Sequence, residues 1–243
     1  MSSSIDFTTD EYRRLLEMAV SRYSCVRFTD CIPEEGGLLW RHDIDFSVHR
    51  AVKAARIESE FGALATYFIQ LSSMFYNVFE REIQEKLAEI RTLGHDIGLH
   101  FDPGAYRVNS EDVTKCLYFE KDVLERLLNI EIKAVSLHNP DVVSDGDEFI
   151  TKAGLINTYD FLPGNGWMYC SDSNGYWRYD PLRTVLQKAP PQNLHVLTHP
   201  AWWQDEPLTP RARIERCARG RAERTMERYD ANLAKANRKN IAK

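Results

Sequence analysis

Short apolar runs alternate with longer amphipathic stretches along this chain, and this alternation most constrains its fold. Apolar runs of strand length occupy 36–45, 63–70, 95–100, 133–138, 156–161, 167–173 and 194–199. Helical periodicity occupies 47–61, 80–93, 111–128 and 147–154. Strands that alternate with helices of about 10–18 residues indicate parallel β/α units. Six or seven such units in succession predict an α/β fold with a closed or nearly closed barrel, not an open doubly wound sheet.

Helices are also expected at both ends of the chain. Thr8 or Thr9 can cap a helix over 10–23, and a long C-terminal helix is expected to begin near Pro210. The chain has neither an internal repeat nor a low-complexity linker. We therefore expect one domain over 1–243, with helical additions over about 1–24 and 209–243.

The composition excludes several classes of protein. Hydrophobic residues make up 43% and charged residues 28%, as in ordinary globular proteins. No apolar run approaches the roughly 18–20 residues of a membrane span, so we expect no transmembrane segment. The polar N-terminus has no apolar core for a signal peptide, which predicts a cytoplasmic protein. The five cysteines are scattered and form no C-x-x-C pair, which disfavours disulfides and thiolate zinc sites.

The net charge of −5 is unevenly distributed. From Arg211 onward the chain has eleven Lys/Arg and four Asp/Glu. Such a tail can bind nucleic acid or anionic lipid, but acids are interspersed and no groove-reading or aromatic element adjoins it. We interpret it as a solvated helix and expect no nucleic-acid partner.

Histidines and carboxylates gather where the predicted strands end. In parallel β/α barrels, the C-terminal ends of the strands form the active site. The first strand ends at Asp43 and Asp45, and later strands end at His100, His138 and His199. Residues two apart on a strand share a face, so the two carboxylates project together while His42 points away. A divalent ion would relieve their repulsion, and aspartate with imidazole suits zinc or another first-row metal.

Three segments carry a family resemblance: WRHDIDFS at 40–47, LGHDIGLHFD at 93–102 and LHVLTHP at 194–200. Together they resemble the polysaccharide deacetylase (NodB-homology) family over roughly residues 38–203. Its members are metal-dependent carbohydrate esterases built on a distorted (β/α)7 barrel. The second segment is similar to the family motif G-H-E-I-G-x-H. The chain resembles a divergent branch found in surface-polysaccharide and O-antigen gene clusters.

The resemblance implies roles for single residues. Asp43 matches the general base, Asp45 the first metal ligand and His100 the first histidine ligand. His199 matches the histidine that protonates the leaving amine. His95 matches a position that is usually not a ligand, and strand periodicity also turns it away from His100.

Two departures from the family pattern stand out. The family has a second histidine ligand four residues after the first, where this chain has Gly104. His138 is the first candidate to replace that ligand, and Asp102 is the second. The family also often has an arginine near the end of strand four that orients the base, and SLHNP at 136–140 lacks it.

The resemblance implies a zinc-dependent N-deacetylase that converts an acetylated amino sugar or glycan into acetate and a free amine. Aromatic and polar side chains suit a sugar, although each aromatic residue could equally be packing of the barrel. The candidate substrate-binding residues are Asp102, Asn139, Tyr169, Asp172, Trp177, Arg178 and Trp202.

Two alternatives remain open at this stage. The same metal and base could serve a different C–N or ester hydrolase. Gly104 favours a non-catalytic sugar-binding protein, whereas the retained pair Asp43 and Asp45 argues against it. The sequence does not distinguish a polymer, a lipid-linked glycan or a nucleotide-sugar as substrate.

Overall fold

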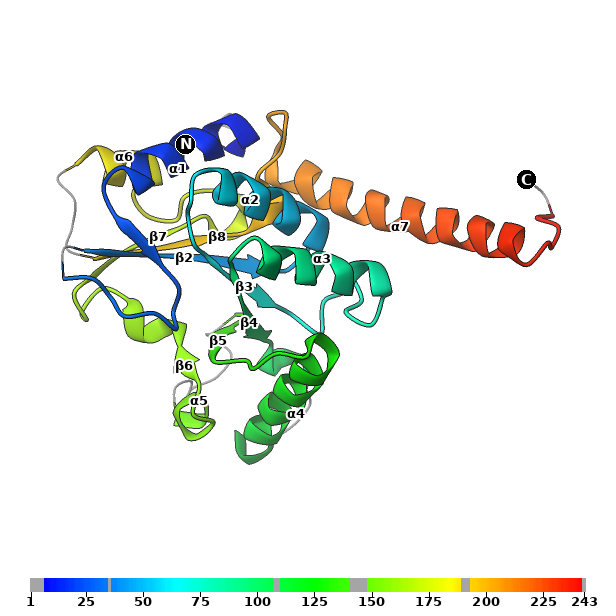
Figure 1. Ribbon diagram of the computed structural model, residues 1–243, viewed down its shortest axis with the longest axis horizontal. Helices are drawn as coiled ribbons and strands as arrows, with labels where there is room; N and C mark the ends of the chain where they lie inside the picture. Colours follow the sequence, from blue (N-terminus) through cyan, green and yellow to red (C-terminus); the bar gives the residue numbers. More distant parts are fainter. Residues whose placement is uncertain (1–6, 35, 107–109, 140–147, 189–192, 242–243) are drawn as a thin grey trace.

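A single parallel sheet forms the centre of the computed structural model, which describes residues 7–34, 36–106, 110–139, 148–188 and 193–241. Seven strands follow the order β6-β5-β4-β3-β2-β8-β7, and β1 adds to β2 (Figure 1). Their bounds are β1 Ser24–Val26, β2 Gly37–Ile44, β3 Thr66–Ile69, β4 Asp96–Phe101, β5 Ala134–Leu137, β6 Ile156–Asn157, β7 Trp167–Ser171 and β8 Asn193–Thr198. All described pairs are parallel, and none joins β6 to β7 within the described residues. The predicted (β/α)7 barrel is confirmed as a curled half-barrel.

Two strands differ from the expectation. β1 was not predicted, because three residues in a polar segment give no strand signal. β1 pairs with residues 37–39 of β2, and β3 pairs with residues 41–44, so both occupy the edge of β2 opposite β8. The strand expected over 156–161 is only two residues long, because a 3-10 helix over Thr158–Phe161 follows it directly.

Helices flank the sheet and also lie at both ends of the chain. Their bounds are α1 Thr9–Val20, α2 Val48–Glu60, α3 Arg81–Thr92, α4 Ser110–Leu128, α5 Glu148–Lys152, α6 Leu182–Gln187 and α7 Pro210–Lys235. The Thr8 side chain caps α1 by accepting from the Glu11 amide at 3.2 Å. Figure 1 shows α7 projecting from the body of the molecule toward the C-terminus. Among the described residues, no helix is long and apolar enough to cross a membrane.

Alternation along β2 separates two cores. Trp40 and Ile44 belong to the large core that includes residues of the flanking helices, whereas Leu39 packs with Phe68 in a small cluster. Space near Phe68 is tight, because a Cβ on Gly98 of β4 would clash with its ring. A side chain larger than hydrogen is therefore excluded at Gly98, two residues before His100. Toward the C-terminal ends of the strands, many of the buried side chains are polar.

Candidate metal and catalytic site

The structure brings together three predicted ligands from three chain segments. Asp45 directly follows β2, His100 lies in β4 and His138 directly follows β5. Asp45 Oδ1 lies 3.1 Å from His100 Nε2 and 3.6 Å from His138 Nδ1. The two histidine nitrogens are 3.1 Å apart. These segments converge because β2, β3, β4 and β5 are consecutive parallel neighbours whose C-terminal ends meet at one edge.

This geometry fits a tetrahedral metal ion. Zinc bonds of about 2.0–2.1 Å in tetrahedral geometry separate two ligand atoms by about 3.3 Å, close to the three distances found here. Asp45 Oδ1 is buried, and no hydrogen-bond donor is aligned with it among the described residues. A buried carboxylate oxygen without a donor is costly unless another group binds it. Asp45, His100 and His138 can therefore hold a divalent ion.

Asp102 does not join this group. Its Oδ1 accepts a hydrogen bond from the Gly104 amide at 2.9 Å, and its Oδ2 accepts one from Gln70 Nε2 at 3.4 Å. The Asp102 side chain thus caps the short 3-10 helix Pro103–Ala105. Gly104 contributes its amide to this cap, at the position where the resembled family has a histidine ligand. His138 is the replacement ligand that the geometry favours.

A serine fixes the orientation of His100. Ser136 Oγ lies 2.6 Å from His100 Nδ1 and donates to Asp43 Oδ1 at 3.1 Å. Because this hydroxyl proton is directed at the carboxylate, the Ser136 oxygen accepts a hydrogen bond from the N–H of His100 Nδ1. That arrangement places the lone pair of the neutral imidazole on Nε2, the atom that faces Asp45. Such outer contacts set the tautomer of metal-ligating histidines.

Asp43 is held by an arginine that the sequence reasoning missed. Arg41 Nε donates to Oδ1 at 2.8 Å and Nη2 donates to Oδ2 at 2.6 Å, and both residues are buried. Burial would raise the pKa of Asp43, but the charge and the hydrogen bonds of Arg41 outweigh it and lower that pKa. The signal was present, since Arg41 precedes Asp43 by two residues and shares its face of the strand. This pair keeps Asp43 ionised and oriented.

His199, which directly follows β8, completes the site. Its Nε2 lies 3.7 Å from Asp45 Oδ2, and its Nδ1 lies 2.6 Å from Asp172 Oδ1. Burial would lower the pKa of His199, but the hydrogen bond and charge of Asp172, with Asp45 and Asp43, raise it to about 9. His199 therefore carries a proton at neutral pH. A protonated imidazole with Nε2 near the metal ligands can act as a general acid.

Asp172 was predicted to bind substrate, but the structure places its side chain inside the protein. We expected it to bind sugar hydroxyls, but it is fully buried and accepts hydrogen bonds from the backbone and side chain of His199 and from Trp203 Nε1. Its two oxygens are thus engaged inside the protein. Asp172 directly follows β7, which pairs with β8, and this pairing brings it to His199. Asp172 positions His199.

The other predicted substrate contacts differ in how far they are buried. Trp177 is core, which corrects the expectation, because it is 8% exposed and stacks on Phe7 at 5.6 Å. Trp202 is also buried, although its ring lies 6.3 Å from that of His199. Tyr169 is half-buried. Two predicted residues are exposed: Asn139 and Arg178. Together with Asp102, the half-buried and exposed residues remain predictions.

The histidines expected to point away from the site do so. His42 is fully buried on the opposite face of β2, where Nε2 bonds Glu58 and Nδ1 lies 2.8 Å from Thr198 Oγ1. His95 Nε2 lies 3.0 Å from the carbonyl oxygen of Ala55. Tyr67 also donates to Glu58 at 2.6 Å, so this second polar cluster joins the sheet to α2.

Comparisons with known proteins return distant structural likenesses only. No protein-family model matches the chain, and neither does any curated protein. The deacetylase PplD of Streptococcus pyogenes, solved in complex with acetate, shares 14% identity over 83% of each chain with a TM-score of 0.49. The peptidoglycan deacetylase PdaC of Bacillus subtilis shares 13% identity over 87% of this chain and 99% of its own, with a TM-score of 0.46.

A pseudoenzyme also has a similar structure. BA3943 of Bacillus anthracis, a CE4 family pseudoenzyme, shares 12% identity with a TM-score of 0.46. The match covers 70% of this chain and 56% of that protein, so this chain spans just over half of it. At such low similarity, the chemistry of this chain has to be argued from its own residues.

Proposed function

We propose that this protein is a metal-dependent carbohydrate N-deacetylase and that its metal is zinc. The observation that best supports this is the set of three ligand atoms at 3.1–3.6 Å, flanked by the ionised Asp43 and the protonated His199. A binding protein has no need for a paired base and acid on the two sides of a metal position. The arrangement suits hydrolysis of an amide, which needs one proton removed from water and one given to the amine.

Each residue of the site then has a defined task. A divalent ion bound by Asp45, His100 and His138 supplies Lewis acidity to a carbonyl oxygen and to a water molecule. Asp43, fixed by Arg41, accepts the proton of the attacking water. Its low pKa makes it a weak base, so its contribution depends on an acidified water and on exact orientation.

His199 acts at the end of the reaction. The water oxygen bonds to the acetamide carbon, the C–N bond breaks, and the proton on His199 Nε2 passes to the departing nitrogen. Asp172 holds the opposite ring nitrogen, and its charge stabilises the imidazolium until the proton is needed. The products are acetate and a free amino sugar. The resemblance in motifs further favours a role in surface-polysaccharide or O-antigen biosynthesis.

Acetate release tests this proposal. We would supply zinc-loaded protein with N-acetylglucosamine, its oligomers and its phosphorylated forms, and compare wild type with D43N. Removal of the base should lower the rate about a hundredfold or more while zinc stays bound, within the range for a general base. The exposed Asp160 provides a matched control, D160N, which should leave the rate unchanged. Turnover of D43N at the wild-type rate would refute the role of Asp43, and hydrolysis of esters alone would favour the other hydrolase.

A further inference from the structure

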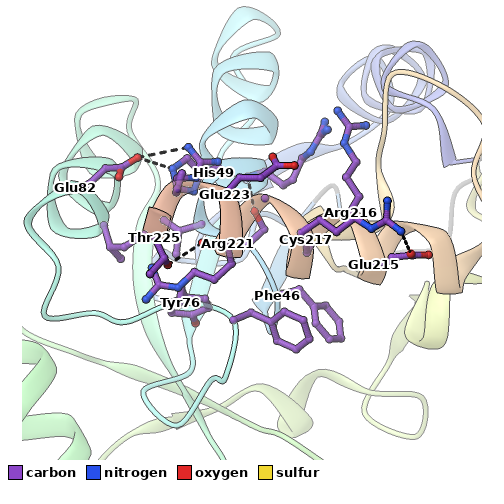
Figure 2. A pocket seen from close by; sticks show the side chains of 18 of the residues that line it. Phe46, His49, Tyr76, Glu82, Glu215, Arg216, Cys217, Arg221, Glu223 and Thr225 are labelled. Atoms are coloured by element: carbon purple, nitrogen blue, oxygen red, sulfur yellow. Dashed lines mark hydrogen bonds and ion pairs between the residues drawn. The ribbon is translucent and has the colours of Figure 1, made fainter. Parts of the chain in front are cut away.

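A cavity of about 650 Å³ lies next to the candidate site, between α7, the N-terminus of α2 and the start of α3 (Figure 2). Phe46 and Ser47, which line it, directly follow the metal-ligand candidate Asp45. Two residues of chain reach about 7 Å, so the backbone of this part of the wall lies within about one sugar length of the Asp45 backbone. Tyr76, also in the wall, donates to the carbonyl oxygen of Ile44 at 2.6 Å.

The wall of this cavity is rich in arginine. Six arginines line it: Arg50, Arg216, Arg219, Arg221, Arg224 and Arg228. Most of the acids in the wall already have cationic partners. Glu80 pairs with Arg221 at 2.5 Å and with Arg228 at 3.1 Å, and Glu82 pairs with His49 at 2.7 Å. Figure 2 shows the His49–Glu82 contact on the α3 side.

Among the described residues, no carboxylate neutralises the charge of Arg50 or Arg216 as closely as Glu80 neutralises that of Arg221. Arg216 Nη1 donates to the neutral amide oxygen of Gln204 at 2.8 Å, and no carboxylate of the described residues lies within 4.0 Å of its guanidinium. Arg50 is 14% exposed, and its contact with Asp205 is a long 3.9 Å. Asp205 also accepts bonds from Lys53 and Thr9. Burial and the charge of Arg216 together lower the pKa of Arg50, as expected for two neighbouring cations.

Two further features favour an anion between them. Ser47, Val48 and His49 at the N-terminus of α2 line the cavity, and the first turn of this 13-residue helix has no acidic residue. The positive end of the helix dipole therefore adds to the two guanidinium groups. Glu223, which also lines the cavity, is seven residues beyond Arg216 on α7, about 10 Å along the helix axis.

We propose that Arg50 and Arg216 bind a phosphate or diphosphate group of the sugar substrate in this cavity. Guanidinium groups match the oxygens of phosphate in geometry and charge. The phosphate would sit beside Phe46 while the acetamide reaches the Asp45, His100 and His138 group. The identification of the ligand as a substrate rests on the proposed deacetylase function. It narrows the substrate to a sugar phosphate, a nucleotide-sugar or a lipid-linked sugar diphosphate, and disfavours a neutral polymer.

Titration calorimetry with sodium pyrophosphate tests the anion site directly. We expect wild type to bind pyrophosphate. R216Q should bind it at least about tenfold more weakly, because the variant loses one charge-assisted contact. R50Q should show a similar loss. R219Q is the matched control, since Arg219 lies on the same helix and cavity but pairs with Glu215 at 2.5 Å. Absence of binding in wild type, or an equal loss in R219Q, would overturn the inference.

Kinetics then connect the site to the reaction. R216Q should raise KM for N-acetylglucosamine 1-phosphate and for UDP-N-acetylglucosamine, and leave hydrolysis of neutral N-acetylglucosamine oligomers unchanged. An unchanged KM for both phosphorylated sugars in R216Q would overturn the inference. Cosedimentation with phosphatidylglycerol vesicles, lost in R216Q, would identify a lipid as the source of the phosphate.

The two proposals fail in different ways. Pyrophosphate binding without acetate release from any substrate would refute the deacetylase and leave the anion site. Acetate release without pyrophosphate binding would refute the anion site alone. Pyrophosphate binding by D43N should equal that of wild type, because Asp43 does not line the cavity.

Discussion

Arg41 binds both carboxylate oxygens of Asp43 through two parallel hydrogen bonds of 2.8 and 2.6 Å. The two residues are two positions apart on β2, so the strand itself places the cation beside the acid. The resembled family often has an arginine near the end of strand four for this task, and this chain lacks it there. Arg41 offers the same orientation from a different position. Both side chains are buried, so the charged form of each residue is stabilised by the opposite charge of the other.

Removal of Arg41 should destabilise the fold. R41M leaves Asp43 as a buried charge without its main partner, and breaking such a pair costs about 3–5 kcal/mol. R41M/D43N should recover much of this loss, because the remaining group is neutral. Denaturant unfolding measures both variants. R126M, which breaks the exposed Arg126–Asp122 pair, should cost about 1 kcal/mol or less, and an equally mild R41M would contradict the account.

Ser136 should tune the metal affinity. S136A removes the hydroxyl that fixes His100 Nδ1, so the imidazole is free to adopt the other tautomer. Loss of such an outer contact typically costs about 10–100-fold in metal affinity. Competition with a chromophoric chelator measures this for zinc. S59A, at an exposed serine on α2, should bind zinc like wild type. An unchanged affinity in S136A would show that the tautomer is set elsewhere.

Asp172 should affect the rate more than substrate binding. D172N removes the charge that stabilises the His199 imidazolium but keeps an oxygen close to Nδ1. We expect kcat to fall about a hundredfold or more, with KM nearly unchanged. Steady-state kinetics on the best acetylated substrate measure both constants. D160N serves as the surface control, and a D172N variant changed only in KM would indicate a role in binding sugar.

Glu120 should make stability depend on pH. Burial and the charge of Asp102 raise the pKa of Glu120 to about 7 from 4.5, although the Tyr106 hydroxyl donates to it at 2.6 Å. Between these values the folded protein keeps this proton while the unfolded chain loses it. The free energy of unfolding therefore falls as pH rises from 4.5 to 7, by up to about 3 kcal/mol from this group.

E120Q removes this contribution. The free energy of unfolding of E120Q minus that of wild type should be more positive at pH 8 than at pH 5. Urea unfolding at both pH values measures this difference. E131Q, at an exposed glutamate, should follow the wild-type pH dependence. Parallel pH profiles for E120Q and wild type would show that Glu120 titrates normally.

Strand periodicity predicted much of the site because it needs only local information. It placed Asp43 and Asp45 on one face and turned His42 and His95 away, as the structure confirms. The convergence of strand ends then brought His100, His138 and His199 together. The fold class followed from the same alternation of short strands and helices.

Other features depend on contacts between distant segments. The pairing of β7 with β8, which brings Asp172 to His199, has no local signature, so the sequence predicted a sugar-binding role for Asp172 instead. Trp177 was predicted to bind sugar because sequence alone does not show which residues cover an aromatic ring. In the structure, Phe7, which is far away in the chain, stacks on it. Arg50 of α2 and Arg216 of α7 are far apart in the chain, and only the structure shows that they line the same cavity.

The metal content of the purified protein tests the central claim most directly. Wild-type protein prepared without chelator and dialysed against zinc should contain about one zinc ion per chain by elemental analysis. H138A should lose most of this zinc, whereas D102N and H49A should keep it, because neither side chain belongs to the ligand group. No zinc in wild type, or full zinc content in H138A, would contradict the proposed Asp45, His100 and His138 site.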